Sequence, residues 1–351
     1  MKSVINLFAA SALTACVFVP ERLPYEVQQV AASVQTAPMP GRGDRADDPA
    51  LWVHPGDAGQ SLILGTDKAK GLYVYGLDGV ERQRLNVGQV NNVDVRGSIA
   101  VASNRGVNGL SWFHIGIGND GGRVSHIGDT PVTRTEPYGT CLGRADDHLL
   151  AGVTYKDGAI ELWRATDEGK ELPEVSLERT VMFDSQLEGC VFDDSEMRLF
   201  IGEEGHGIWV LDLSEFEANA REVDTIAAGN GLVADVEGLA LYITPGGGYL
   251  IASAQRADRF VIYDRSPPYG IVGAFSVSGS ADGHIDAVSH TDGIDISSTA
   301  LPGFPLGVLI VQDDANPRSG MNQNFKIVDW RHVEAAIERL RAGPAAAEES
   351  R

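Results

Sequence analysis

The stretch DRADDPALWVHPGDAGQSLILGTDKAKGLYVYGLDG, residues 44–79, contains the unit that decides the fold. Its second half holds two apolar, strand-like runs separated by the polar turn 67–70, and the second run ends in the aromatic residue Tyr75. This pattern predicts a β-hairpin. Carboxylates and lysines gather at the ends of these runs, which suggests a site that holds metal ions and an anion together.

The same unit occurs five more times along the chain, each copy with an aromatic residue near its end. The copies are SIAVASNRGVNGLSWFHI (98–115), HLLAGVTYKDGAIELWRA (148–165), MRLFIGEEGHGIWVLDL (197–213), GYLIASAQRADRFVIYDR (248–265) and GVLIVQDDANPRSGMNQNFKIVDW (307–330). Spacings of roughly 37 to 58 residues are typical of propeller blades. Because the aromatic residues align in all six copies, chance repetition of hairpins is disfavoured. We therefore predict an all-β fold over residues 41–332, a six-bladed β-propeller with four-stranded antiparallel blades around a central channel.

Composition narrows the possible partners. The chain has 351 residues with a formal net charge of −21, and 43% of its residues are hydrophobic, so it can bury a large core. Nucleic acid is excluded as a partner because phosphate backbones require an excess of Lys and Arg. An acidic surface is compatible with calcium, which takes oxygen ligands. We expect a monomer.

The N-terminus reads as an export signal. An apolar run too short to span a bilayer follows Lys2 and ends in LTAC (13–16), which resembles a bacterial lipobox with a lipid anchor at Cys16. The alternative is an ordinary cleaved signal peptide. Either reading places the mature protein outside the cytoplasm, as a periplasmic or cell-envelope lipoprotein or as a secreted protein. We expect a tether over 17–40 and a C-terminal helix and tail over 333–351.

Cys141 and Cys190 are the remaining cysteines. In an oxidising compartment they could form a disulfide, but they could equally be two small buried apolar residues. The second interpretation is slightly favoured.

A polar or acidic residue precedes the first strand of each blade. In a propeller these strands are innermost, so we expect one ring at the mouth of the channel: Asp48, Asp94, Tyr138, Glu188, Glu237 and Asp292. The hairpin turns should bring a second set to the same face: Lys68, Arg105, Lys156, Glu203, Glu204, Gln255 and Asp313. Burying so many carboxylates requires counter-ions. The available lysines and arginines, Lys70 among them, are too few, so several bound calcium ions are predicted.

A metal-rich site beside basic side chains suits hydrolysis of a polyanionic phosphate ester. Structural calcium alone is the simpler alternative. The eight histidines are assigned structural or solvated roles, with His54 and His290 lying closest to the acidic ring.

Residues 44–330 resemble the β-propeller phytases, six-bladed calcium-dependent enzymes that dephosphorylate phytate. The resemblance is carried in every blade by motifs that include DDPALWVHP, NNVDVR, EPYGT, EGCVFDD, GEEGHGIWVLDL, DVEGLALY, TDGIDIS and NQNFKIVDW. It implies that phytate, or its calcium complex, is the substrate. The phosphate contacts implied are Lys68, Lys70, Arg105, Tyr138, Lys156 and Gln255. The calcium ligands implied are Glu188, Glu203 or Glu204, Asp235 and Glu237 at the cleavage site, with Asp48, Asn92, Asp94, Asp292 and Asp313 at further calcium positions.

The mechanism implied is direct, in-line attack on phosphorus by a water or hydroxide that bridges calcium ions, without a phosphoenzyme. Glu188, Asp235 and Glu237 would hold those ions while Lys68 contacts the phosphate. One departure from the family concerns the first turn, where Lys68 and Lys70 are separated by an alanine instead of being adjacent. The alternatives are a calcium-dependent propeller lactonase or esterase, and a non-catalytic lipoprotein propeller that binds a partner.

Overall fold

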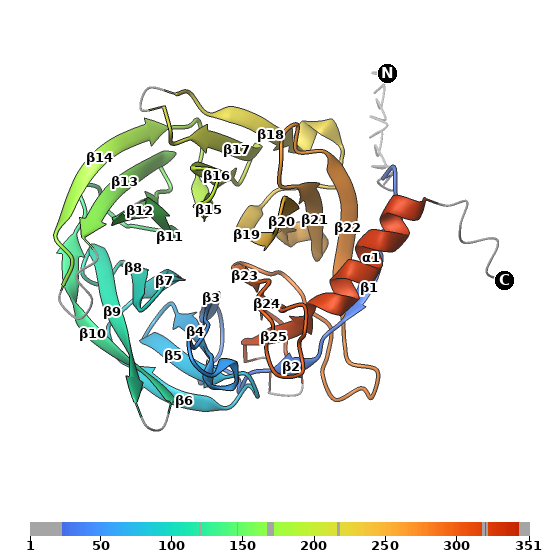
Figure 1. Ribbon diagram of the computed structural model, residues 1–351, viewed down its shortest axis with the longest axis horizontal. Coiled ribbons are helices and arrows are strands. Elements are labelled where there is room, and N and C mark those ends of the chain that lie inside the picture. Colours follow the sequence, from blue (N-terminus) through green and yellow to red (C-terminus); the bar gives the residue numbers. More distant parts are fainter. Residues whose placement is uncertain are drawn as a thin grey trace, which may run out of the picture.

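A computed structural model describes residues 23–118, 121–145, 147–166, 172–215, 218–317, 320 and 322–343. Six sheets stand around a central channel like the blades of a fan, and the chain passes through them in order (Figure 1). The predicted six-bladed β-propeller is confirmed. The predicted signal segment 1–16 and Cys16 lie outside the described residues, and no described helix is long and apolar enough to cross a membrane.

In each blade the innermost strand comes first and the chain steps outward. Blade 1 contains β3 (Ala46–Trp52), β4 (Leu62–Asp67), β5 (Gly71–Gly76) and β6 (Glu81–Leu85). Blade 2 contains β7 (Val90–Arg96), β8 (Ile99–Asn104), β9 (Gly109–Gly118) and β10 (Gly121–Pro131). Blade 3 contains β11 (Thr140–Ala145), β12 (His148–Thr154), β13 (Ala159–Thr166) and β14 (Val175–Met182).

The second half repeats this order. Blade 4 contains β15 (Leu187–Asp193), β16 (Arg198–Glu203), β17 (Gly207–Asp212) and β18 (Arg221–Thr225). Blade 5 contains β19 (Val236–Thr244), β20 (Gly247–Ala254), β21 (Arg259–Asp264) and β22 (Ile271–Ser278). Blade 6 contains β23 (Ile294–Ser297), β24 (Val308–Asp313) and β25 (Asn324–Asp329).

The N-terminal segment closes the ring. β2 (Val34–Gln35) pairs antiparallel with β25 and supplies the fourth strand of blade 6, while β1 (Gln28–Ala31) pairs in parallel with β22 and adds a fifth strand to blade 5. The expectation of a tether over 17–40 is therefore wrong for these two strands. Their backbone groups complete sheet edges that would otherwise be open.

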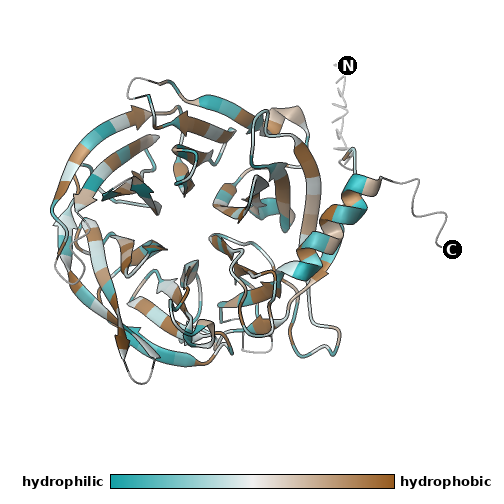
Figure 2. Ribbon diagram, in the orientation of Figure 1, coloured by the Kyte–Doolittle hydropathy of each residue, from teal (hydrophilic) through white to brown (hydrophobic). Residues whose placement is uncertain are grey.

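Burial follows the distance from the channel. All seven residues of β3 are buried because both faces of an inner strand pack against neighbouring blades, whereas the outer strand β6 alternates between half-buried and exposed residues. Figure 2 shows the result, with apolar residues concentrated in the inner strands and polar ones spread over the rim. The core is thus a series of layers between blades.

The predicted C-terminal helix is present as α1 (Trp330–Ala342), and its N-cap residue Asp329 accepts a hydrogen bond from the Arg331 backbone N–H. Its apolar face packs on β1 and β22 at the edge of blade 5 (Figure 1). Trp330 is fully buried and stacks on Tyr242 with ring centroids 3.8 Å apart. Residues 344–351 lie outside the described part of the chain.

Cys141 and Cys190 form a disulfide with an S–S distance of 1.98 Å, so the favoured expectation of two unpaired cysteines is wrong. They lie on β11 and β15, neighbouring innermost strands that belong to different sheets. Propeller closure brings their Cα atoms to 5.7 Å, which is within the range that a disulfide spans. The bond ties blade 3 to blade 4 beside the channel.

Candidate active site

Residues at the start of the innermost strands, or just before it, form a ring at the mouth of the channel. In blades 1, 2, 4 and 5 the strand pairing shifts register immediately around this position, for example between Leu187 and Cys190. Such a bulge turns a side chain away from the regular alternation. The equivalent ring positions are Asp47, Asn91, Tyr138, Glu188, Glu237 and Asp292.

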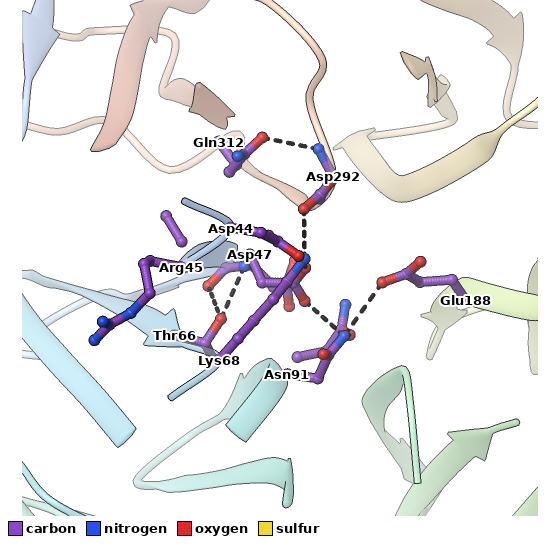
Figure 3. Close-up of polar contacts among 12 residues, drawn as sticks. Asp44, Arg45, Asp47, Thr66, Lys68, Asn91, Glu188, Asp292 and Gln312 are labelled. Carbon is purple, nitrogen blue, oxygen red and sulfur yellow. Dashed lines mark hydrogen bonds and ion pairs between the residues drawn. The ribbon is translucent and has the colours of Figure 1, made fainter. Parts of the chain in front are cut away.

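Two residues that we expected in the ring, Asp48 and Asp94, do not lie in it. Asp47 and Asn91, not Asp48 and Asp94, occupy the ring in blades 1 and 2. The Asn91 side-chain amide donates to Asp47 Oδ2 at 2.8 Å and to Glu188 Oε1 at 3.2 Å, so it links blade 1 to blade 4 across the mouth (Figure 3). The bulge at the start of β3 explains the first error, because Asp47 and Asp48 both lie inside it, whereas Asp94 lies beyond the bulge of β7 in regular pairing with Val101.

Glycines following the ring residues set how closely the blades approach. A Cβ atom at Gly139 would lie 2.0 Å from the Glu188 carbonyl oxygen, and one at Gly189 would lie 2.1 Å from the Glu237 carbonyl oxygen. Only glycine permits this contact between the backbone of one blade and the ring residue of the next. In blades 3 to 6 the glycine that follows each ring residue therefore allows neighbouring blades to pack closely.

A carboxylate cluster lies at the centre of the mouth. Glu188, Glu204 and Glu237 each place an oxygen within 4.8 Å of the others. Burial raises the pKa of Glu188 to about 7, and burial followed by the charge of Glu188 raises the pKa of Glu237 well above its ordinary value. Glu237 Oε2 is buried without a hydrogen-bond partner. This cluster fits a divalent cation, because oxygens held this close together need either a shared proton or a bound cation between them.

Lys68 lies beside the cluster in a nest of carboxylates. Its Nζ is 2.8 Å from Asp44 Oδ1, 2.8 Å from Asp47 Oδ1 and 2.9 Å from Asp292 Oδ2 (Figure 3). Burial alone would lower the pKa of Lys68, but the three carboxylates outweigh it and raise that pKa above its ordinary value. Burial raises the pKa of Asp47 to about 6 and that of Asp292 to about 8. Lys68 is therefore charged, and it is the shared ion-pair partner of Asp44, Asp47 and Asp292.

A second cation borders the cluster from blade 3. Lys156 Nζ lies 4.2 Å from the ring centroid of Tyr138, a cation–π contact that holds the ammonium group at the rim. Burial raises the pKa of the Tyr138 hydroxyl, so this group stays protonated and can donate a hydrogen bond. Tyr138 and Lys156 together form a polar, cationic flank.

These groups surround a cavity of about 350 Å³ that opens at the mouth of the channel. Its lining is Asp44, Lys68, Tyr138, Glu188, Glu204, Asp235, Glu237, Gln255, His290, Asp292, Asp314 and Gln323. The structure thus brings together most of the predicted cleavage site. Asp44, Asp47 and Asn91 were not among the predicted site residues, although the first two stand in the stretch 44–79 and Asn91 stands in the motif NNVDVR.

Asp48, Asn92 and Asp94 line the channel itself, in a separate cavity of about 220 Å³. Asp48 accepts a hydrogen bond from the Val93 backbone N–H at 2.9 Å, and Asp94 accepts one from that of Leu142 at 2.8 Å. Each carboxylate thereby fastens its blade to the next one. Their predicted role as calcium ligands remains a prediction, away from the mouth cavity.

Asp313 and Glu203 have partners of their own outside the cavity lining. Asp313 is fully buried and pairs with the fully buried Lys326. Glu203 accepts hydrogen bonds from the Ser185 hydroxyl at 2.7 Å and from Trp209 Nε1 at 2.8 Å. Both carboxylates are stabilised by protein donors, so Glu204 is the member of the Glu203–Glu204 pair that faces the site.

Of the other predicted residues, Asp235 and Gln255 line the cavity. Asp235 pairs with Arg256 at 2.9 Å, and the Gln255 side-chain amide donates to Asp292. Arg105 and Lys70 do not line it; Lys70 is exposed, and the Nε of Arg105 is buried without a hydrogen-bond partner.

Comparisons with known proteins agree with this geometry. The model of the phytase family matches residues 2–342. The 3-phytase of Bacillus subtilis (strain 168) is 36% identical over 327 residues, which cover 87% of this chain and 84% of that protein. A solved structure of a mitotic checkpoint complex covers 89% of this chain and 82% of its own at 12% identity with a TM-score of 0.47, a likeness too weak to bear on fold or function. The chain belongs to the phytase family.

Proposed function

We propose that this chain is a calcium-dependent phosphomonoesterase that releases inorganic phosphate from phytate. The observation that carries the proposal is the cluster of Glu188, Glu204 and Glu237, with a buried and unpartnered carboxylate oxygen, next to a charged lysine. The relative named 3-phytase supports phytate as the substrate.

Calcium suits this site better than a thiolate- or imidazole-seeking metal. The described cavity lining offers many carboxylate oxygens and two amide side chains, with a single histidine, His290, and no cysteine. Calcium takes six to eight oxygen ligands in flexible geometry. Glu188, Glu204 and Glu237 would hold the ions, with Asp235 and Asp47 at their edge. When bound, calcium supplies the positive charge that stabilises phosphoryl oxygens and acidifies water.

The protein groups have separate tasks. Lys68 stabilises negative charge on the phosphoryl group undergoing transfer, because its ammonium stays protonated. Tyr138 and Lys156 hold a neighbouring phosphate by a hydroxyl donor and an ammonium. No Ser, Thr or Cys side chain is among the described residues that line the cavity, which argues against a phosphoserine, phosphothreonine or phosphocysteine intermediate, and the attack proposed is by water.

The decisive assay measures inorganic phosphate released from phytate by the purified chain with calcium, with a chelator, and with calcium restored. We expect release only in the first and third conditions. Glu188→Gln should abolish it, while Glu222→Gln, at an exposed carboxylate paired with His206 on the outer strand β18, should not. Release that ignores the chelator would refute the calcium requirement, and no release in any condition would refute the phytase activity.

We also propose that the protein acts outside the cytoplasm, anchored by a lipid at Cys16. The Cys141–Cys190 disulfide supports an oxidising compartment. Metabolic labelling with a radioactive fatty acid should mark the wild-type chain and leave Cys16→Ser unlabelled. An unlabelled wild-type chain recovered from the medium would contradict the anchor.

A further inference from the structure

Arg256 stands at the rim of the mouth cavity on the turn between β20 and β21. Its side chain is 67% exposed, and its Nε donates to Asp235 Oδ2 at 2.9 Å. Within the described part of the chain, no hydrogen bond or ion pair engages the two Nη groups of this guanidinium. A guanidinium held through Nε presents its Nη groups outward, in the geometry that binds a phosphate through two parallel hydrogen bonds.

The turn that carries Arg256 is fixed to the wall of the cavity. Asp258 accepts a hydrogen bond from the His290 backbone N–H at 2.7 Å, and both residues adopt left-handed backbone conformations, with φ of 50° and 44°. Gln255 from the same turn donates to Asp292. His290 and Asp292 line the cavity, so these two bridges hold the arginine beside it.

Two cations, Arg256 and Lys156, lie near the carboxylate of Glu204. The positive charges of Lys156 on blade 3 and of Arg256 on blade 5 each act to lower the pKa of Glu204, which belongs to blade 4. The two cations therefore flank the carboxylate cluster. Tyr138 and Lys156 account for one neighbouring phosphate, but a hexakisphosphate also extends other phosphates toward blade 5, where Asp235 and Asp292 would repel them.

We propose that Arg256 binds a non-reacting phosphate of the substrate on the blade 5 side of the cavity, so that substrates with many phosphates are preferred. The proposal rests on the proposed function, which supplies the polyphosphorylated substrate. In the metal-free protein Arg256 is the counter-ion of Asp235. If Asp235 were to hold a calcium ion, Arg256 would share this carboxylate with the ion and its guanidinium would be left to the substrate.

This arrangement gives a test that a purely structural role would fail. Arg256→Ala should raise KM for phytate about five- to tenfold, the cost of one charge-assisted contact at an exposed site, with kcat little changed. KM for glycerol phosphate, which has a single phosphate, should not move. Calcium affinity measured by calorimetry without substrate should stay the same or become tighter. Arg256→Lys should lie between wild type and alanine.

Arg82→Ala is the matched control, because Arg82 is 47% exposed and pairs with Asp78 through a similar contact on the outer strand β6. Binding of myo-inositol hexasulfate in the presence of calcium separates this inference from the proposed function, since it requires no turnover. We expect Arg256→Ala to weaken hexasulfate binding by the same factor as it raises KM. Unchanged hexasulfate binding, or an equal loss with glycerol phosphate and with calcium, would overturn the proposal. A wild-type protein that binds hexasulfate but releases no phosphate would count against the proposed function alone.

Discussion

Replacing Glu237 by glutamine tests the central cluster through stability as well as activity. In the metal-free protein Glu188 and Glu237 are buried within one cluster, and burial raises the pKa of Glu188 from 4.5 to about 7. The folded state therefore holds this proton more tightly than the unfolded chain does. The metal-free protein loses stability as the pH rises from 4.5 through about 7, and a displacement of this size corresponds to about 3 kcal/mol.

Glu237→Gln removes a buried carboxyl group whose own ionisation is opposed by burial and by the charge of Glu188, and it keeps the side-chain shape. Without calcium at pH 8, the variant should be more stable than wild type by about 1–3 kcal/mol, which for a chain of this length is a rise of roughly 1–4 °C in Tm. With calcium the order should reverse, because the variant has lost a ligand oxygen. Phosphate release should fall by at least about a hundredfold.

Differential scanning calorimetry at pH 5 and pH 8, with calcium and with chelator, measures the Tm of the variant and of the wild type in each condition. Glu222→Gln should follow the wild-type values in all four conditions. The reasoning is refuted if Glu237→Gln is less stable than wild type in chelator at pH 8, because the charges of the cluster would then not be in conflict. If calcium stabilised the variant as much as the wild type, Glu237 would not be a calcium ligand.

Three further predictions concern charge, covalent linkage and ring closure. The stabilisation that calcium gives to the wild-type protein should grow between pH 5 and pH 8, because protons leave Glu188 and Asp47 (pKa about 7 and about 6) over this interval; a Tm shift independent of pH would contradict those assignments. Replacing both Cys141 and Cys190 by serine should lower the free energy of unfolding by about 2–4 kcal/mol, given a sequence separation of 49 residues. It should also weaken calcium binding, because Glu188 lies two residues from Cys190. Unfolding and calcium-binding curves equal to those of the wild type would show that the disulfide has neither role. Deleting residues 23–35 should give a chain that unfolds at a clearly lower temperature, since blade 6 loses β2 and blade 5 loses β1. Circular dichroism melts of the full and the shortened chain measure this difference, and an equal Tm would contradict a stabilising role for the two strands.

The hairpin pattern was sufficient for the fold because it reflects local physics. Each blade contributes a pair of buried strands rich in Val, Ile and Leu around a polar turn, and six copies allow only a closed ring. β1 and β2 gave no such signal, because four residues and two residues are too short to show alternation. Their strand structure depends on the edges of β22 and β25, which only the assembled propeller provides.

The site was predictable in its chemistry and less so in its register. Glu188, Glu237 and Asp292 stand at equivalent places and were identified correctly as ring residues. Asp47 was passed over for its neighbour Asp48, because the bulge at the start of β3 reverses which of the two faces the mouth. Arg256 was overlooked since the adjacent Gln255 matched the expected motif, and only the fold shows that the arginine pairs with Asp235.

The pairing of β2 with β25 has a consequence for how this molecule is made. Residues 34–35 are among the first of the described chain to be synthesised, and their partners, 326–327, are among the last. Blade 6 therefore cannot be completed until nearly the whole polypeptide has appeared. β2 therefore has no partner strand until β25 has been synthesised, so the seam between the two ends of the propeller cannot close before then. The mouth, which draws Asp47 from the first blade and Asp292 from the loop before the last, comes into existence only with that final step.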